Sequence, residues 1–135
     1  MKNCFVLILA VLLAGCATTQ TAAVSAEAPH RLHHLVVIWL KQSGDEGLRQ
    51  QYIEANRGLA QLPGVVAYDV GTPAVIQRQR ANAAVDESYD VAISAVFENQ
   101  EAFEAFLKHP DYVRTAQQVL RPLVNKYSVY DFIEH

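Results

Sequence analysis

The order of apolar patterns after residue 30 constrains the fold more than any other feature of this chain. Runs rich in β-branched and aromatic residues are typical of strands, and apolar stripes at spacings of three and four are typical of amphipathic helices. In chain order they predict strand, helix, strand, strand, helix and strand, over residues 33–40, 43–62, 65–70, 89–97, 99–109 and 125–133. We therefore expect an α+β domain of the ferredoxin-like βαββαβ type, with helices on one face of a four-stranded antiparallel sheet.

Capping residues mark where the expected helices begin. Ser43 followed by Glu46 has the spacing of a capping box, and Asn99 is expected to cap the second helix. Asp111 is expected to cap a third helix, which Pro122 must bend or end. Residues 76–88 have no clear period and are expected to form a long loop. The apolar stripe of the first helix consists of Leu48, Tyr52, Ala55, Leu59 and Leu62.

The predicted sheet has apolar side chains on both faces. Helices of a ferredoxin-like fold cover one face only, and an exposed apolar face of several hundred Å² is unusual for a monomer. We therefore expect a homodimer in which two sheets pack face to face as a dimeric α/β barrel. Trp39 is expected at that interface. The second apolar face is formed by Leu35, Val37, Ala92 and Val96.

The first sixteen residues have the pattern of a secretory signal. Lys2 precedes an uninterrupted apolar run at residues 5–13, which is shorter than the ~20 residues that a membrane-spanning helix needs. The run ends in residues 13–16, Leu-Ala-Gly-Cys, which resemble a bacterial lipobox. The resemblance implies removal of residues 1–15 and lipid attachment to Cys16. An ordinary signal peptide with a chance cysteine is the alternative.

A short tether is expected between the lipid anchor and the folded domain. Residues 17–28 are small and polar without aromatic side chains, so they bury too little apolar area to fold. The expected organisation is a signal peptide at 1–15, a lipidated N-terminus with tether at 16–30, and a folded domain at 31–135. Ala17 is not the Asp that often retains bacterial lipoproteins in the inner membrane. The lipobox resemblance therefore implies the outer membrane of the cell envelope.

Composition and spacing argue against several classes of function. The formal net charge is −3, so no basic surface points to nucleic acid. Cys4 and Cys16 are too few for a disulfide scaffold or a zinc cluster. His33 and His34 are adjacent on a strand and point to opposite faces, so they do not share a metal ion. Neither a phosphate-binding glycine motif nor a nucleophile elbow occurs, and we expect neither a metal nor a cofactor.

Three segments together resemble the stress-responsive dimeric α/β-barrel (Dabb) family. They are HLVVIWLK at 34–41, the strand from Tyr89-Asp90 to Phe97-Glu98, and FLKHPDYV at 106–113 with its His-Pro dipeptide. The resemblance covers residues 31–134. It implies a ferredoxin-like dimer with a cavity between sheet and helices, but it implies no single activity because one fold hosts many functions.

The resemblance also implies where catalysis would occur. Plant polyketide cyclases of this family use a tyrosine and a histidine in the helical signature, and this chain has Phe106 and Tyr112 at the matching positions. Phe106 has no hydroxyl to move a proton, and a tyrosine pKa near ~10 suits a base at neutral pH poorly. The strand histidine is kept as His34. We therefore assign no catalytic residue, and Tyr112 acting with His34 remains the alternative arrangement.

These observations predict a binding function. His34, Phe106 and Tyr112 are the candidate ligand-binding residues, although His34 could instead bond a loop and Phe106 could be plain core. His109, at a helix end, is expected to stabilise that end through the helix dipole. The expected protein is a membrane-anchored, non-catalytic homodimer that binds a small apolar ligand. The alternatives are a cofactor-free cyclase-, lyase- or monooxygenase-like enzyme using the same cavity, and a structural envelope protein with a filled interior.

Overall fold

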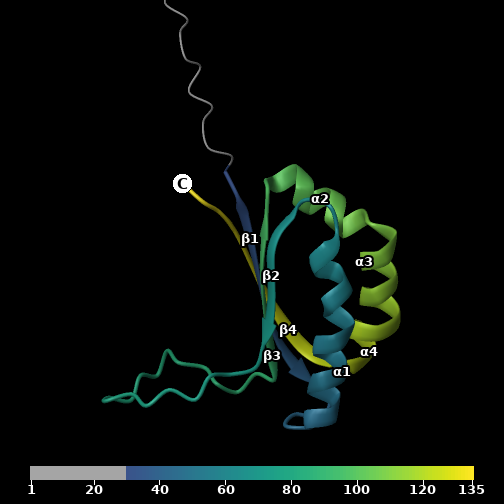
Figure 1. Cartoon of the computed structure of the whole chain (residues 1–135). Helices are drawn as coiled ribbons and strands as arrows, with labels where there is room; N and C mark the ends of the chain where they lie inside the picture. The colour runs from purple at the N-terminus through teal and green to yellow at the C-terminus, as the bar shows by residue number, and fades with distance from the viewer. Residues whose placement is uncertain (1–29) are drawn as a thin grey trace, which may run out of the picture.

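The computed structural model describes residues 30–135 and has two layers, a four-stranded sheet and a set of helices on one of its faces (Figure 1). The strands are β1 (Leu32–Leu40), β2 (Val65–Gly71), β3 (Val91–Phe97) and β4 (Val124–Ile133). They lie in the order β2-β3-β1-β4, and every neighbouring pair is antiparallel. The expected α+β, ferredoxin-like architecture is confirmed. The expected signal, Cys16 and most of the tether lie outside the described residues.

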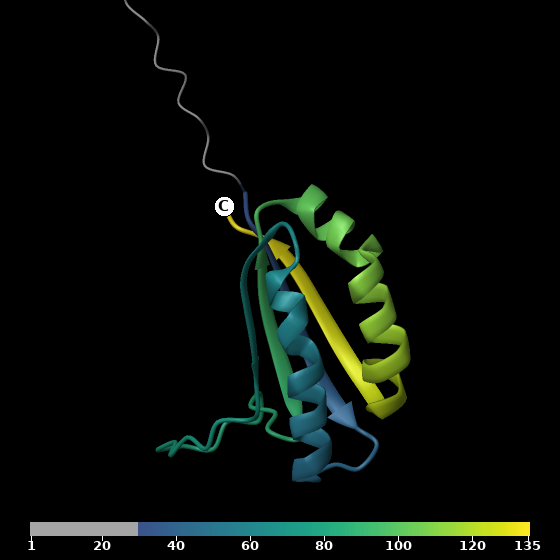
Figure 2. The same cartoon turned by 45° about the vertical axis from the view of Figure 1, so that its right-hand side comes forward.

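The helical layer comes from two parts of the chain that lie on the same side of the sheet (Figure 2). Within residues 30–135, no helix has the length and apolar character needed to cross a bilayer. The helical segments are α1 (Glu46–Asn56), the 3₁₀ turn η1 (Arg57–Gln61), α2 (Gln100–Lys108), α3 (Pro110–Thr115), the π-helical turn η2 (Ala116–Leu120) and α4 (Arg121–Leu123).

The first helix is capped by a different residue from the one expected. The carboxylate of Asp45 accepts a hydrogen bond of 2.8 Å from the backbone N–H of Leu48. Ser43 donates its hydroxyl to Asp90 instead, at 3.1 Å. The capping box expected at Ser43 is therefore wrong, because a buried carboxylate on another element takes that hydroxyl.

The third helix also begins differently. His109 caps α3 through Nδ1, which accepts a bond of 3.2 Å from the backbone N–H of Asp111, so the cap expected at Asp111 is wrong. His109 thus caps the start of α3 with its side chain, and at the end of α2 its backbone N–H donates to the carbonyl of Phe106. Asn99 caps α2 as expected. The helical segment that begins with α3 widens into the π-helical turn η2 and ends at Leu123, next to Pro122. Proline has this effect because it lacks an N–H and crowds the preceding turn.

One apolar core joins the two layers. Inward-facing residues of β1 and β3 alternate as expected, with Ile38 opposite Val91 and Val36 opposite Ile93. The α1 stripe is confirmed, since Tyr52 and Leu59 are buried. The buried core consists of Leu32, Ile38, Leu40, Tyr52, Leu59, Val91, Ile93, Ala95, Phe97, Phe103, Phe106 and Leu120.

The face of the sheet away from the helices, the open face, carries a second set of apolar side chains. Tyr130 and Phe132 on this face are 59% and 49% exposed. The helices lie on the other side of the sheet (Figure 1). Strand register and alternation place on the open face His33, Leu35, Val37, Trp39, Ala92, Ser94, Val96, Ser128, Tyr130 and Phe132.

The connection between β2 and β3 is a long projection, the arm (residues 72–90). It contains no helix or strand, in agreement with the loop expected at 76–88. Its two legs run next to each other away from the body, on the open-face side of the sheet (Figures 1 and 2). The arm is therefore an extension of the domain and not part of its core.

A buried carboxylate at the base of the arm joins three elements. Asp90 is fully buried and accepts backbone N–H bonds from Leu40 (2.9 Å) and Gly44 (2.8 Å), together with bonds from Ser43 and Arg49. Burial opposes the charge, but these four donors outweigh it and hold the pKa of Asp90 below its ordinary value. Gly44 has a φ of 81°, which favours glycine and turns its N–H toward the carboxylate.

Replacing Asp90 with asparagine is expected to lower the free energy of unfolding by about 2–4 kcal/mol. The amide turns an N–H donor toward groups that themselves donate, and Arg49 loses its charged partner. Asp69→Asn is the control, since Asp69 is exposed on β2, and its effect is expected to stay below about 0.5 kcal/mol. Urea unfolding at neutral pH measures both, and equal stabilities would contradict the role given to Asp90.

The same pair of proteins tests the charge of Asp90. A carboxylate whose pKa is depressed by folding stabilises the folded state above its ordinary value and loses that contribution as the pH falls through the lower, folded-state pKa. The stability gap between wild type and Asp90→Asn is therefore expected to shrink below pH 3.8, the ordinary value.

Candidate functional site

A cavity of about 430 Å³ lies between the sheet and the helical layer. This volume lies within the range of small-molecule sites, roughly 300–1,000 Å³. Every strand and both parts of the helical layer contribute to its wall. The lining residues are His34, Val36, Ile38, Tyr52, Asn56, Leu59, Tyr68, Ile93, Phe106, Tyr112, Ala116, Leu120, Arg121, Val124, Asn125, Tyr127 and Val129.

The cavity is open beside β4 because the helices leave this edge strand partly uncovered. Tyr127 and Val129 pair with Ile38 and Val36 of β1, so they face the helical side. They are nevertheless 61% and 42% exposed. Arg121, at the start of α4, lines the same opening. The site therefore has an apolar floor on the sheet, a helical roof and an entrance at β4.

The three candidate residues from the sequence all line this cavity. His34 lies on the inward face of β1, Phe106 on α2 and Tyr112 on α3. The ring centroids of Phe106 and Tyr112 are 4.7 Å apart. Phe106 also packs against Phe97, at 4.9 Å, so it belongs to the core and to the cavity wall at once. Ligand binding at these residues stays a prediction.

Sequence analysis missed the carboxylate that holds His34. Asp131 lies opposite His34 in the register of β1 and β4, and its Oδ1 is 2.6 Å from Nδ1 of the histidine. An ionised carboxylate only accepts hydrogen bonds, so Nδ1 carries a proton toward Asp131, and Nε2 is the ring nitrogen left available to a ligand. The sequence does contain a signal for this residue. Asp131 is the one charged residue that alternates with the inward-facing Tyr127, Val129 and Ile133.

Buried tyrosines give the cavity neutral hydrogen-bonding groups. Tyr68 donates its hydroxyl to Asn56 Oδ1 at 2.9 Å, and the Asn56 amide donates to the backbone carbonyl of Tyr52 at 2.8 Å. Burial raises the pKa of Tyr52 to about 12, and it raises the pKa of Tyr68 and of Tyr112 as well. These phenols are therefore protonated at neutral pH and cannot serve as bases.

The two adjacent histidines lie on opposite faces, as the strand pattern predicts. His33 stacks on Phe132 on the open face, with ring centroids 4.7 Å apart, whereas His34 faces the cavity. Among residues 30–135, no group of three or more His, Cys, Asp or Glu side chains is placed to hold a metal ion.

Solved structures show the same fold at low sequence identity. A Dabb family protein with a ferredoxin-like fold from Mesorhizobium loti is 21% identical, with a TM-score of 0.64, covering 78% of this chain and 98% of that one. A dimeric ferredoxin-like protein of unknown function from Thermobifida fusca is 20% identical, with a TM-score of 0.60 and coverages of 78% and 92%. A hydroxynitrile lyase from Passiflora edulis is 20% identical, with a TM-score of 0.62 and coverages of 79% and 95%.

The family itself follows from the sequence comparison. A search of curated proteins finds no match. The model of the stress responsive A/B barrel domain matches residues 32–134, which include every strand and helix described above. Because this match spans most of the chain, the protein belongs to the stress responsive A/B barrel domain (Dabb) family.

Proposed function

We propose that this protein is a membrane-anchored, non-catalytic homodimer of the bacterial cell envelope that binds a small, mainly apolar ligand. The observation that carries the proposal is the cavity of about 430 Å³ with an entrance at β4. Its walls are mainly aliphatic and aromatic, and its polar groups are few and placed at separate points. Ligand sites combine these two properties, because apolar area supplies affinity and a few polar groups fix orientation.

The polar groups favour a ligand with one or two oxygen atoms on an apolar body. Tyr112 is a neutral donor, and His34 has Nε2 available to a ligand because Asp131 occupies Nδ1. Arg121 adds a positive charge beside the entrance. A phenol, an aromatic ketone or an aromatic acid would satisfy these groups while its ring contacts the walls.

Homodimer formation accounts for the open face. Tyr130 and Phe132 are about half exposed there, and a second sheet packed on this face would remove them from water. Two solved relatives, from Thermobifida fusca and Bacteroides fragilis, are described as dimeric proteins with this fold. The ligand cavity lies on the helical side, so it stays accessible in a dimer built through the open face.

The membrane anchor rests on Cys16 and the lipobox-like residues before it. Lipid attached there would hold the domain at the outer membrane by a tether of about fifteen residues, since each buried methylene adds ~0.8 kcal/mol of membrane affinity. Cys16→Ser is expected to abolish lipid attachment and to release the protein from the membrane fraction. Mass spectrometry of the N-terminus and fractionation of cells measure the two effects. An unlipidated wild-type Cys16 would contradict the anchor.

Binding in the cavity is tested with the apolar fluorescent probe 1-anilinonaphthalene-8-sulfonate. Val129→Trp is expected to weaken probe binding at least about tenfold, because the indole fills the entrance beside β4. Val66→Trp is the control, since Val66 is similarly exposed, at 45%, but does not line the cavity. Equal affinity of the two variants would show that the probe binds elsewhere.

Polar contacts are tested in the same assay. His34→Ala and Tyr112→Phe are each expected to weaken binding a few-fold, since one hydrogen bond contributes about 1 kcal/mol. The matched controls are His33→Ala, on the other face of β1, and Tyr89→Phe, outside the cavity. Unchanged affinity in both cavity variants would show that the proposed pocket is misplaced.

A cofactor-free enzyme is the second candidate, and one contact favours it. Asp131 holds Nδ1 of His34 at 2.6 Å, an arrangement in which a histidine can take a proton at Nε2. One relative of this fold is a hydroxynitrile lyase. If the protein is non-catalytic, we expect that mandelonitrile and enolisable aromatic ketones react no faster with the protein than in buffer alone. Turnover that is lost in both His34→Ala and Asp131→Asn would establish the enzyme instead.

A further inference from the structure

We propose that the arm is a clasp for the second copy of this chain, in which Val75 and Ile76 pack against the edge of the partner's sheet. This inference rests on the proposed homodimer and states what holds the two copies together besides their open faces. It assigns a binding surface to a segment that lies outside both the core and the cavity.

The root of the arm is attached to the open face, which sets the direction of the projection. Trp39, an open-face residue of β1, donates its Nε1–H to the hydroxyl of Ser88 at 3.0 Å. Asp86 accepts from the backbone N–H and the hydroxyl of Ser88, at 2.8 and 2.6 Å. Two residues later, Asp90 is buried in the body. The returning leg is therefore held on the side of the sheet where a partner's sheet would pack.

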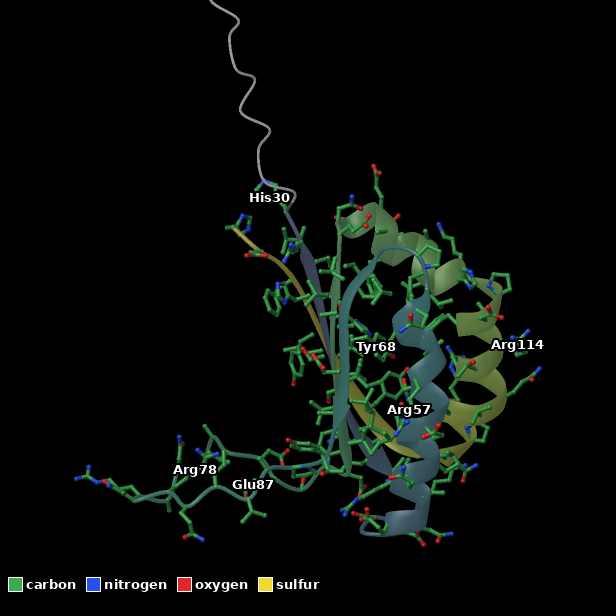
Figure 3. The ribbon with its side chains drawn as sticks, viewed as in Figure 1. His30, Arg57, Tyr68, Arg78, Glu87 and Arg114 are labelled. Atoms are coloured by element: carbon green, nitrogen blue, oxygen red, sulfur yellow. The ribbon has the colours of Figure 1, made fainter. Side chains whose placement is uncertain are left out.

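The pictures show the same direction. In Figure 3, Arg78 and Glu87 of the arm lie on one side of the sheet, and Arg57 and Arg114 of the helical layer lie on the other. The cavity entrance is beside β4 and faces the helical side. The arm is therefore not placed to cover the cavity of its own protomer.

Contacts between the two legs make the arm a defined projection. The side chains of Arg78 and Glu87, on opposite legs, form an ion pair of 3.9 Å. Near the tip, Asn82 accepts backbone N–H bonds from Val85 and Ala84, each of 3.0 Å. These bonds close a turn. These contacts join the two legs of the arm and close its tip.

Two adjacent apolar residues on the arm are exposed to solvent within the protomer. Val75 is 94% exposed and Ile76 is 54% exposed. Their neighbours further along the arm are polar or charged, from Gln77 to Arg80. Exposed β-branched aliphatic side chains cost free energy in water, and burying them against another apolar surface recovers it. The pair is therefore the part of the arm suited to contact a protein.

The length of the chain allows this pair to reach the partner's sheet. Two sheets that pack face to face lie about 10 Å apart, and an extended chain advances about 3.3 Å per residue. Val75 and Ile76 follow Gly71 by four and five residues, so they reach at most about 13–17 Å from it. That reach exceeds the gap between the two sheets, so the pair can contact the edge of the partner's sheet. Two-fold symmetry would give two such contacts per dimer.

Sedimentation equilibrium of the full chain in density-matched detergent tests the arm. The double variant Val75→Asp with Ile76→Asp is expected to raise the dimer dissociation constant at least about tenfold. Ala81→Asp with Ala83→Asp adds the same charge near the tip, past the partner's sheet, and is expected to leave that constant unchanged. A wild-type monomer at all concentrations would overturn the homodimer and the arm together.

Other outcomes concern the arm alone. If wild type is a dimer and both double variants have the same dimer dissociation constant as wild type, the arm inference is wrong and the homodimer still holds. Equal weakening by both variants would show a general charge effect and would also overturn the packing of Val75 and Ile76. A measurement without variants is trypsin cleavage after the exposed Arg78. Cleavage is expected to slow at least several-fold as the dimer forms, and a rate independent of protein concentration would contradict the clasp.

Discussion

The carboxylate of Asp90 is the contact on which the rest of the arrangement depends. It binds the end of β1, the turn at Gly44 and Arg49 of α1 from a fully buried position at the start of β3. These bonds fix where α1 begins and how it lies over the sheet, and α1 supplies Tyr52 and Asn56 to the cavity wall. They also fix one end of the arm. A buried charge with four donors is costly to rearrange, so the cavity and the arm both start from a rigid point.

The uncovered part of β4 decides where the proposed ligand would enter. In a fully covered sheet, Tyr127 and Val129 would be core residues, since they face the helical side. Here the helical segment from α3 to α4 leaves space above them, and His34 lies next to this space with Asp131 holding its ring. The same geometry would suit either of the two proposed functions, ligand binding or proton transfer. Proton transfer would also need a second acid–base group beside His34, and this requirement separates the two functions. Phe106 has no hydroxyl, and burial keeps Tyr112 protonated.

Local patterns predicted the elements well, and long-range contacts account for what they missed. The strand alternation and the α1 stripe are local, and they placed His34, Phe106 and Tyr112 correctly on the elements. The cap predicted at Ser43 is wrong because the Ser43 hydroxyl donates to Asp90, which is distant in sequence. The pair of His34 with Asp131 depends on the register of β1 against β4, and the direction of the arm depends on Trp39 bonding Ser88. A local sequence pattern carries no information about contacts between residues so far apart in the chain.

Strand β1 links the two proposed binding surfaces. It is central, with β3 on one side and β4 on the other, and its alternate residues serve opposite faces. His34, Val36 and Ile38 line the cavity, whereas the residues between them form the open face and Trp39 holds the arm. A shift of β1 by one residue would exchange the two sets, so both surfaces depend on one register.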